Sequence, residues 1–339
     1  MDDFGVVHAL PDHASDAGDS SYEDSASSTA SISSSVFAYE QEHGRTYHAY
    51  QAGKYVLPND EEEQDRMDIQ YHAIRLLFEN KPFFAPIGEK PERIVDFGTG
   101  TGIWAMDVGD AYPNATVIGT DLSPIQPTFV CPNVQFEIND VTDIPWTYKP
   151  NSFDLVHTRI MNGFGIRNWT DFYRESYNAL KPGGWVESQE FSLEVNTDDA
   201  SLPPDSAITK WCDLLYEGAL TGAGQKLRLT GDELRVAMEE AGFVDITIRN
   251  FKLPIGPWAA DEKLRETGQY ALLAMLEGLF GISVAIFTRF LGWEIGELEV
   301  LLALVRAEWR RRKVHTYWPL FVAYGRKPLV AQNTDGENY

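Results

Sequence analysis

The sequence has few cysteines and few basic residues. Cys131 and Cys212 are its only cysteines, which excludes a disulfide scaffold and favours a reducing compartment. Its 339 residues carry 51 acidic and 28 basic side chains, a net charge of -23, so we expect no direct nucleic-acid binding. The first residues also lack the basic start and apolar run of a secretory signal. We therefore expect an intracellular protein, in the cytoplasm or the nucleus.

Only one hydrophobic run approaches the length of a membrane-spanning helix. It extends from Ala271 to Thr288 and is interrupted by Glu277. A charge within a membrane span is costly, so we favour a buried helix or substrate cover and expect no membrane span.

The chain ends differ from the rest in composition. Residues 1–35 are rich in serine and acidic side chains and contain no Lys or Arg. Such a segment buries too little apolar surface to offset the entropy of ordering, so we predict a disordered tail. The tail is either a solvated segment or an interaction arm. Residues 329–339 form a second predicted tail.

An aromatic, helical lead-in is predicted over residues 36–90, where we expect it to cover the active site. Asp60 can cap a helix that runs to Leu77, with acidic residues in its first turn where the helix dipole favours them.

A regular alternation of short apolar runs and helical patterns follows over residues 91–328. Val- and Ile-rich runs predict strands at 93–97, 115–120, 134–138, 153–158 and 185–191, with two more near 243–251 and 315–327. Helices are expected near 102–111, 168–180, 204–220, 230–241, 261–291 and 294–312. Alternating strands and helices predict an α/β domain with a parallel sheet covered on both faces. Helical segments near 200–225 and 258–312 are expected to cap its ligand edge.

The strongest motif is Asp96-Phe97-Gly98-Thr99-Gly100-Thr101-Gly102, which links the first predicted strand of this domain to a helix. Three glycines at alternate positions let a ligand approach bare backbone amides closely. A nicotinamide or flavin fingerprint would need a glycine where Ile103 stands, so an oxidoreductase is disfavoured.

The G-x-G-x-G spacing, with an acid two residues ahead, resembles motif I of class I S-adenosylmethionine-dependent methyltransferases. The resemblance implies a Rossmann-like fold with a seven-stranded sheet of order 3-2-1-4-5-7-6, the last strand antiparallel. It also implies that the loop containing Gly98, Thr99, Gly100 and Gly102 wraps the methionine part of S-adenosylmethionine, with Asp96 near the ammonium group.

Two further acids follow at the ends of the next predicted strands. Asp121 can accept hydrogen bonds from both ribose hydroxyls. The resemblance implies that Asp140 accepts from the adenine amino group and that the backbone amide of Val141 contacts the ring. Each acid alone could be a turn residue or helix cap, but three acids in this order favour a cofactor site.

Further phrases resemble fungal LaeA-like methyltransferases. They include Gly44-Arg45-Thr46-Tyr47-His48, the run from Tyr55 to Asp60, Val156-His157-Thr158-Arg159, and the ALKPGGWVE phrase ending at Glu187. That family includes a nuclear regulator that works with velvet-family proteins and relatives in biosynthetic clusters. Tyr47 and His48 are candidates to cover the cofactor. The alternative is that they have a purely packing role.

Methyl transfer needs alignment more than a dedicated base. His157 is a candidate base, with a buried histidine that shapes the site as the alternative, and Arg159 is a candidate to hold a carboxylate or orient the acceptor. Alternation along the strand predicts that at most one of Glu187 and Glu190 faces the substrate. The remaining histidines show no metal-binding spacing, so no metal is expected.

Two functions follow from these observations. The first is transfer of a methyl group from S-adenosylmethionine to a small-molecule acceptor, in an enclosed hydrophobic pocket of a fungal secondary-metabolism enzyme. The second is a LaeA-like nuclear regulator that acts through velvet-type protein partners. The sequence leaves the methylated atom open among O, N, S and C.

Overall fold

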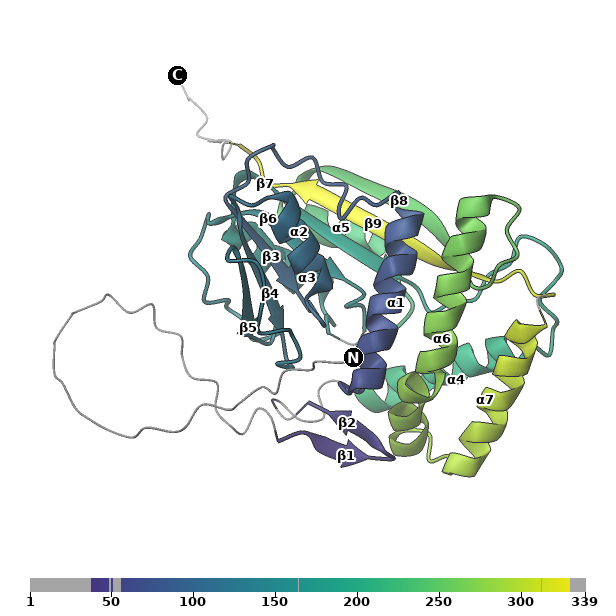
Figure 1. Ribbon diagram of the computed structural model, residues 1–339. Coiled ribbons are helices and arrows are strands. Elements are labelled where there is room, and N and C mark those ends of the chain that lie inside the picture. The colour runs from purple at the N-terminus through teal and green to yellow at the C-terminus, as the bar shows by residue number, and fades with distance from the viewer. Residues whose placement is uncertain (1–37, 49, 51–55, 164, 312, 330–339) are drawn as a thin grey trace, which may run out of the picture. The chain divides into compact units, whose positions relative to one another are not determined.

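A mixed seven-stranded sheet forms the centre of the computed structural model, which describes residues 38–48, 50, 56–163, 165–311 and 313–329. The strand order is β5-β4-β3-β6-β7-β9-β8 (Figure 1). The strands are β3 (Arg93–Phe97), β4 (Thr116–Asp121), β5 (Val134–Ile138), β6 (Phe153–Arg159), β7 (Leu180–Phe191), β8 (Val244–Pro254) and β9 (Tyr317–Arg326). Neighbours from β5 to β7 pair in parallel, whereas β9 pairs antiparallel with both β7 and β8. This arrangement confirms the predicted order and the antiparallel last strand.

Helices cover both faces of the sheet, as a largely buried parallel sheet requires. The helix α2 (Ile103–Ala111) packs on one face with Ile94 and Leu155. On the other face, α3 (Trp169–Ala179) and α5 (Gly231–Ala241) pack with Val95 and Val156. Adjacent residues of β3 therefore point into hydrophobic cores on opposite faces of the sheet. The helices cover these faces, and the carboxyl ends of the strands remain available for a site.

The other helices form a cap with a hydrophobic core of its own. They are α1 (Glu61–Leu77), α4 (Ala207–Ala223), α6 (Glu262–Arg289) and α7 (Ile295–Arg310). Helices α1 and α6 run side by side (Figure 1). The prediction that Asp60 caps α1 is confirmed, because its side chain accepts a hydrogen bond from the Glu63 amide.

By length and composition α6 is the one helix in the described part of the chain that could cross a membrane. However, 61% of its most apolar window is buried in the protein. Buried residues such as Leu279, Val284 and Phe287 belong to the cap core. The apolar character of α6 is thus accounted for by packing within the cap.

The lead-in is not wholly helical, which corrects the prediction for that segment. Strands β1 (Glu40–Glu42) and β2 (Arg45–Tyr47) form an antiparallel hairpin. His43 and Gly44 join them, both at positive φ (51° and 78°). A two-residue loop with positive φ at both positions matches the right-handed twist of paired strands. The predicted tail at 1–35 lies outside the described residues, as does the predicted tail at 329–339 except for its first residue, Leu329.

Pro182-Gly183-Gly184, between the predicted helix at 168–180 and the predicted strand at 185–191, lies within β7. Helix α3 already ends at Ala179, and Leu180 pairs with Phe153 before the register shifts. Gly183 takes a φ of 85° in this irregular stretch. The motif therefore bends the start of a strand.

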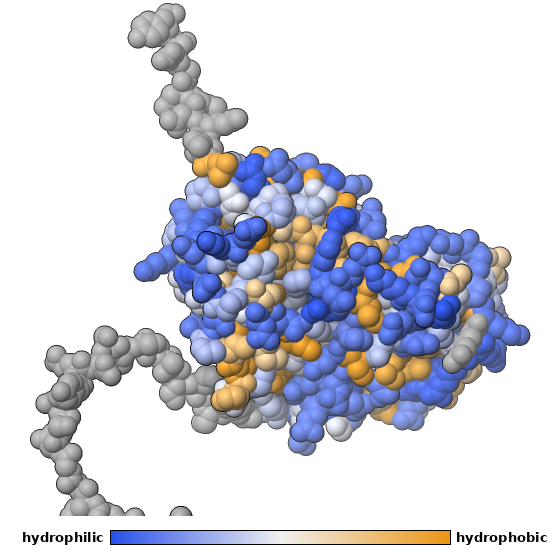
Figure 2. All heavy atoms as spheres, turned by 45° about the horizontal axis from the view of Figure 1, so that its top comes forward, coloured by the Kyte–Doolittle hydropathy of each residue, from blue (hydrophilic) through white to orange (hydrophobic). Residues whose placement is uncertain are grey.

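The face shown in Figure 2 is mainly hydrophilic, with smaller groups of hydrophobic residues between the polar ones. Among the described residues, ten large hydrophobic side chains are exposed, of which Phe129 is the most exposed. Two of them, Val300 and Leu304, lie one turn apart on α7. Scattered exposed apolar groups are normal on a protein surface.

Candidate active site

The glycine-rich loop joins β3 to α2 in a conformation that other residues rarely adopt. Gly98, Gly100 and Gly102 have φ values of 70°, 58° and 81°. The amide of Thr99 donates to the Thr120 carbonyl at 2.9 Å, which holds the loop against the end of β4. Positive φ carries little strain only for glycine, so the spacing of the three glycines sets the path of the loop.

A cavity of about 450 Å³ opens beside this loop at the carboxyl ends of the strands. Of the residues predicted to bind cofactor or act in catalysis, seven line it: Gly98, Thr99, Gly100, Asp121, Asp140, Val141 and Arg159. The other five, Asp96, Gly102, His157, Tyr47 and His48, are not among the lining residues. The cavity has the size and position typical of a ligand site in an open α/β sheet.

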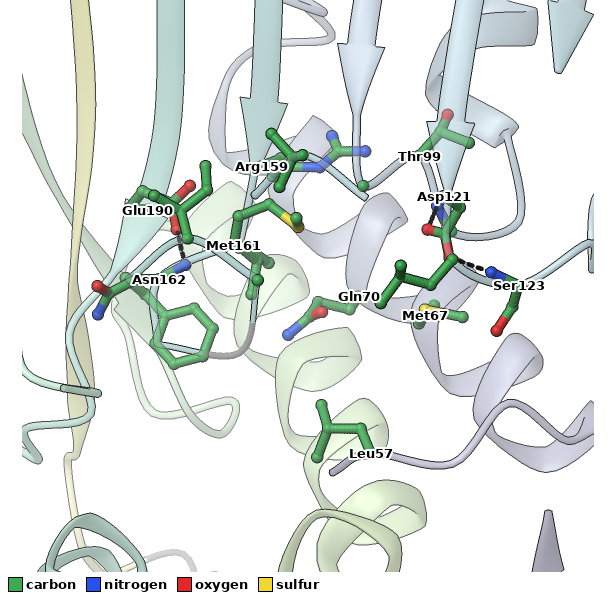
Figure 3. Close-up of a pocket in the computed structure, with 18 of the residues that line it drawn as sticks. Leu57, Met67, Gln70, Thr99, Asp121, Ser123, Arg159, Met161, Asn162 and Glu190 are labelled. Carbon is green, nitrogen blue, oxygen red and sulfur yellow. Dashed lines mark hydrogen bonds between the residues drawn. The ribbon is translucent and has the colours of Figure 1, made fainter. Parts of the chain in front are cut away.

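Asp121 lies at the end of β4, where its carboxylate is held by backbone amides (Figure 3). Its two oxygens accept hydrogen bonds from the amides of Gly100 and Ser123, at 2.9 and 3.0 Å. Asp121 is partly exposed to the cavity, and desolvation by the surrounding protein raises its pKa to about 6. Each carboxylate oxygen keeps a further lone pair for a ligand hydroxyl.

Asp140 and Val141 follow β5 and line the same end of the cavity. The carboxylate of Asp140 accepts hydrogen bonds from the amide and hydroxyl of Thr142, at 2.8 and 2.6 Å. The carbonyl of Val141 accepts from the Trp146 indole at 2.9 Å. These bonds fix the loop in place.

His157 is fully buried below the cavity and does not reach it. Its Nδ1 lies 2.7 Å from Asp96 Oδ1, and its ring stacks on Trp104 at 3.8 Å with an interplanar angle of 3°. This placement supports the alternative of a buried histidine that shapes the site, and not a base in contact with an acceptor. Asp96 is also buried, and its carboxylate is turned toward His157 and does not line the cavity.

Tyr47 and His48 are also buried away from the cavity. The Tyr47 ring lies under the Arg289 guanidinium at 5.1 Å and belongs to the cap core. Burial raises the pKa of Tyr47 to about 12. Side chains of α1, including Met67 and Gln70, stand at the cavity instead (Figure 3).

Arg159 lies at the end of β6, in the middle of the cavity wall (Figure 3). Its guanidinium stacks over the Tyr71 ring at 4.5 Å. Burial lowers the pKa of Arg159, but no carboxylate within the described residues forms a salt bridge with it. A cation at the cavity wall without a salt-bridge partner favours a negatively charged ligand group.

The two glutamates of β7 point in different directions, and only one of them lines the cavity. Glu187 accepts hydrogen bonds from the amides of Phe84 and Ala85, at 2.7 and 2.6 Å. Glu190 instead lines the cavity. Sequence reasoning did not select Glu190 or its neighbour Asn162 as site residues. For Glu190, alternation along β7 was the only signal in the sequence.

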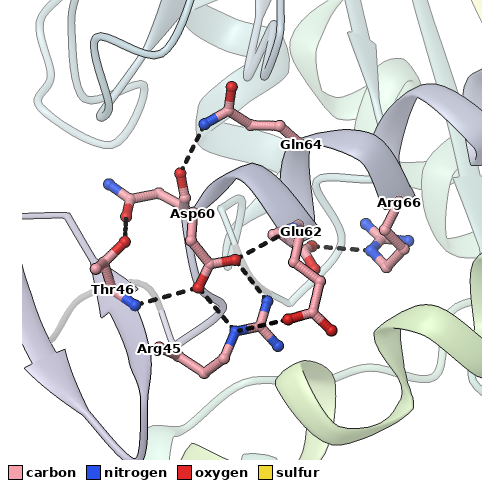
Figure 4. A network of polar contacts seen from close by, with 8 residues as sticks. Arg45, Thr46, Asp60, Glu62, Gln64 and Arg66 are labelled. Atoms are coloured by element: carbon pink, nitrogen blue, oxygen red, sulfur yellow. Dashed lines mark hydrogen bonds and ion pairs between the residues drawn. The ribbon is translucent and has the colours of Figure 1, made fainter.

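A network of partly buried charges holds the hairpin of β1 and β2 against the start of α1 (Figure 4). Arg45 of the hairpin donates two hydrogen bonds of 2.7 Å to Asp60, which also accepts from the Thr46 amide. Arg66 pairs with the buried Glu63 at 3.0 Å, and burial raises the pKa of Glu63. The network fixes α1, which forms one wall of the cavity.

No group of three His, Cys, Asp or Glu side chains suited to a metal occurs in the described part of the chain. The polar groups at the cofactor end include carboxylates, backbone amides, the Arg159 guanidinium and the Thr99 hydroxyl. The Thr99 hydroxyl has no hydrogen-bond partner within the described ranges. This set of groups fits a ligand with hydroxyl and amino donors.

Comparison with known proteins agrees with this geometry. The "methyltransferase domain" family matches residues 69–248. Methyltransferase pytC of Aspergillus terreus is 39% identical over 90% of this chain and 93% of its own. Secondary metabolism regulator LAE1 of Cochliobolus heterostrophus is 35% identical over 85% of this chain and 94% of its own. Protein-methionine methyltransferase laeA of Emericella nidulans is 33% identical over 86% of this chain and 77% of its own.

The chain belongs to the methyltransferase domain family and has the class I fold. It is a LaeA-like methyltransferase, and S-adenosylmethionine is its cofactor. The residues present fit this cofactor. The adenosine part has hydroxyl and amino donors for Asp121 and Asp140, and the carboxylate of the methionyl part suits Arg159.

Proposed function

We propose that the protein methylates a small, mainly apolar molecule of fungal secondary metabolism. The observation that carries this proposal is the composition of the cavity beyond the glycine loop. There the walls are Trp211, Leu215, Met275 and Trp318, from the cap and β9. An enclosed apolar site with few polar groups is typical of small-ligand binding.

In the proposed reaction the chain binds and aligns both reactants. Asp121 accepts the ribose hydroxyls, Asp140 accepts from the adenine amino group, and Arg159 holds the methionyl carboxylate. When bound, S-adenosylmethionine supplies a methyl group on a positively charged sulfur, so the leaving group is already good. Holding the acceptor atom in line with that methyl group then supplies much of the rate enhancement. The cap helices exclude water from the site.

The test uses fungal extract as a source of acceptors. Purified protein is incubated with methyl-labelled S-adenosylmethionine and extract, and the label is followed into the organic-soluble small molecules and into protein. We expect label in the small-molecule fraction, and less of it with the Asp121→Ala variant at the same cofactor concentration. Label found only in protein would contradict the proposal.

The relatives named as a secondary metabolism regulator and as a protein-methionine methyltransferase support a second candidate function. In this alternative the protein acts in the nucleus through protein partners of the velvet type. Affinity purification from fungal nuclei tests it: co-purification of such a partner, together with label transfer to protein alone, would favour regulation over metabolite methylation.

A further inference from the structure

Besides Arg159, the cavity wall contains a buried arginine, Arg66. It lies on α1, and only 5% of the residue is exposed. Arg159 lies at the end of β6 and suits the methionyl carboxylate of the cofactor, so a different partner is needed for Arg66. A charged side chain inside a protein is stable only when it is paired and hydrogen-bonded. The contacts of Arg66 therefore decide whether it calls for a ligand.

The guanidinium of Arg66 uses only one of its nitrogens within the described part of the chain. Its Nε donates a hydrogen bond of 3.0 Å to Glu63 Oε1 (Figure 4). Its Nη1 and Nη2 donate to none of the described residues, and neither belongs to the buried atoms that lack a partner, so both remain accessible. Because Arg66 lines the cavity, these two nitrogens offer four N–H donors to a ligand there.

Helix α6 makes room for this side chain at Gly278. An added Cβ at that position would overlap Arg66 Cδ and would lie 3.1 Å from Ile282 Cδ1. Met275 and Ile282, about one turn to either side of Gly278, both line the cavity. The glycine therefore lets Arg66 pack against the part of α6 that forms the wall of the acceptor end.

The surroundings of Arg66 suit an apolar molecule with a single negative charge. The apolar lining residues include Leu57, Trp211, Leu215, Met275 and Ile282. Glu190 also lines the cavity, but burial raises its pKa to about 8, so near neutral pH it is mainly protonated and does not repel an anion. The planar guanidinium matches the two oxygens of a carboxylate. A phosphate monoester carries more charge than one arginine balances.

We propose that Arg66 binds the methyl acceptor and that the acceptor is a mainly apolar molecule with a carboxylate group. This inference rests on the proposed function and names the substrate class of that site. Nη1 and Nη2 of Arg66 donate to the two carboxylate oxygens, and Nε continues to donate to Glu63. Arg66 thereby fixes one end of the acceptor, while the apolar part of the cavity holds the rest.

The experiment compares two probes of similar size and shape, 2-naphthoate and 2-naphthamide, which differ in charge. Each is titrated by calorimetry at pH 7 into protein saturated with S-adenosylhomocysteine, whose own carboxylate occupies Arg159 in the proposed binding mode. We expect wild-type protein to bind 2-naphthoate at least about tenfold more tightly than 2-naphthamide, the range of a hydrogen bond to a charged group.

The double variant Arg66→Gln/Glu63→Gln removes the arginine without leaving a buried charge. Both residues become neutral amides, so no carboxylate is left without its cation. We expect the preference for 2-naphthoate to disappear. Arg326→Gln/Asp245→Asn is the matched control, because this surface pair of β9 and β8 does not line the cavity and its loss also leaves the net charge unchanged. The control should keep the preference of wild-type protein.

A preference that survives in the Gln/Gln double variant, or wild-type protein that does not prefer 2-naphthoate, would overturn the proposal. If that double variant does not fold, Arg66→Lys decides. The lysine keeps the charge and an ion pair with Glu63 but lacks the two Nη atoms, so the preference should fall several-fold, and an unchanged preference would overturn the proposal.

Affinity for S-adenosylmethionine is measured in parallel on wild-type protein and on every variant. Wild-type protein that does not bind the cofactor would refute the proposed function itself. Intact cofactor binding without a preference for 2-naphthoate would refute only the acceptor site.

Discussion

The two ends of the cavity are built in different ways. The cofactor end consists of turns at the ends of β3, β4 and β5, where backbone conformation and short-range hydrogen bonds set the geometry. The acceptor end is assembled from β7 and from helices of the cap that lie far apart in the sequence. The comparison teaches that local sequence determines the first end and tertiary packing the second. Mutations should therefore affect the two ends separately.

The largest expected effect comes from breaking the glycine loop. Gly100→Arg places a side chain at a φ of 58° and 3.3 Å from the Met67 sulfur, in the space where backbone meets ligand. We expect no measurable binding of S-adenosylmethionine in calorimetry. Gly88→Arg is the matched control, because nothing lies within 4 Å of its added Cβ. Equal affinity in the two variants would contradict the role of the loop.

The next largest effect concerns the wall of the acceptor end. Arg66→Ala leaves Glu63 buried without its cation, which should lower the free energy of unfolding by about 3–5 kcal/mol. Arg174→Ala removes an exposed pair with Asp171 at the same i,i+3 spacing, and should cost less than about 0.5 kcal/mol. Urea denaturation measures both. Similar losses would mean that burial of the first pair has no energetic consequence.

A smaller effect is expected at the cofactor end from Asp121→Ala. The variant removes the acceptor of the ribose hydroxyls, so binding of S-adenosylmethionine should weaken by roughly 1.5–3 kcal/mol in calorimetry. Binding of 2-naphthoate should change little, because Asp121 lies on β4 and Arg66 on α1. A loss of both affinities would show that the two ends are not independent.

A separate effect, measured on stability and not on binding, is a pH dependence from Glu190. Its pKa is raised to about 8 by burial, so the folded protein holds the proton more tightly than the unfolded chain. Its contribution to stability is complete below the ordinary glutamate pKa and is lost as the pH rises through about 8. Arg159 faces it and lowers the pKa, and Tyr173 is a further titratable neighbour.

Glu190→Gln should remove this dependence. Thermal unfolding of wild-type protein and variant between pH 5 and pH 9 measures it, and we expect the wild-type melting temperature to fall relative to the variant as the pH rises. A constant difference over this range would mean that Glu190 does not titrate as its burial implies.

The sheet was predictable because its signals are local. β3 and β5 have the predicted bounds, since each is a short apolar run between turn residues. The hairpin of β1 and β2 was missed because three-residue strands are too short to show alternation and its turn uses His43 where Asn or Asp is the usual signal. The start of β7 was missed because Pro182 and Gly183 are typical of loops.

Only the part of the site that lies at the carboxyl ends of strands was predictable. The glycine loop, Asp121 and Asp140 follow from spacing, because the carboxyl ends of parallel strands share one edge. The direction in which His157 points does not follow from spacing, because β6 is buried on both faces and hydrophobic alternation carries no information there. The cavity-lining role of α1, and the absence of Tyr47 from that lining, depend on how the lead-in packs against α6.

The most direct test of the central claim is calorimetric titration of wild-type protein with S-adenosylmethionine and, separately, with NAD. The account predicts saturable binding of S-adenosylmethionine at one site per chain and no binding of NAD, because the third glycine of a dinucleotide fingerprint is replaced by Ile103. Folded protein that binds NAD, or that binds neither compound, would contradict it.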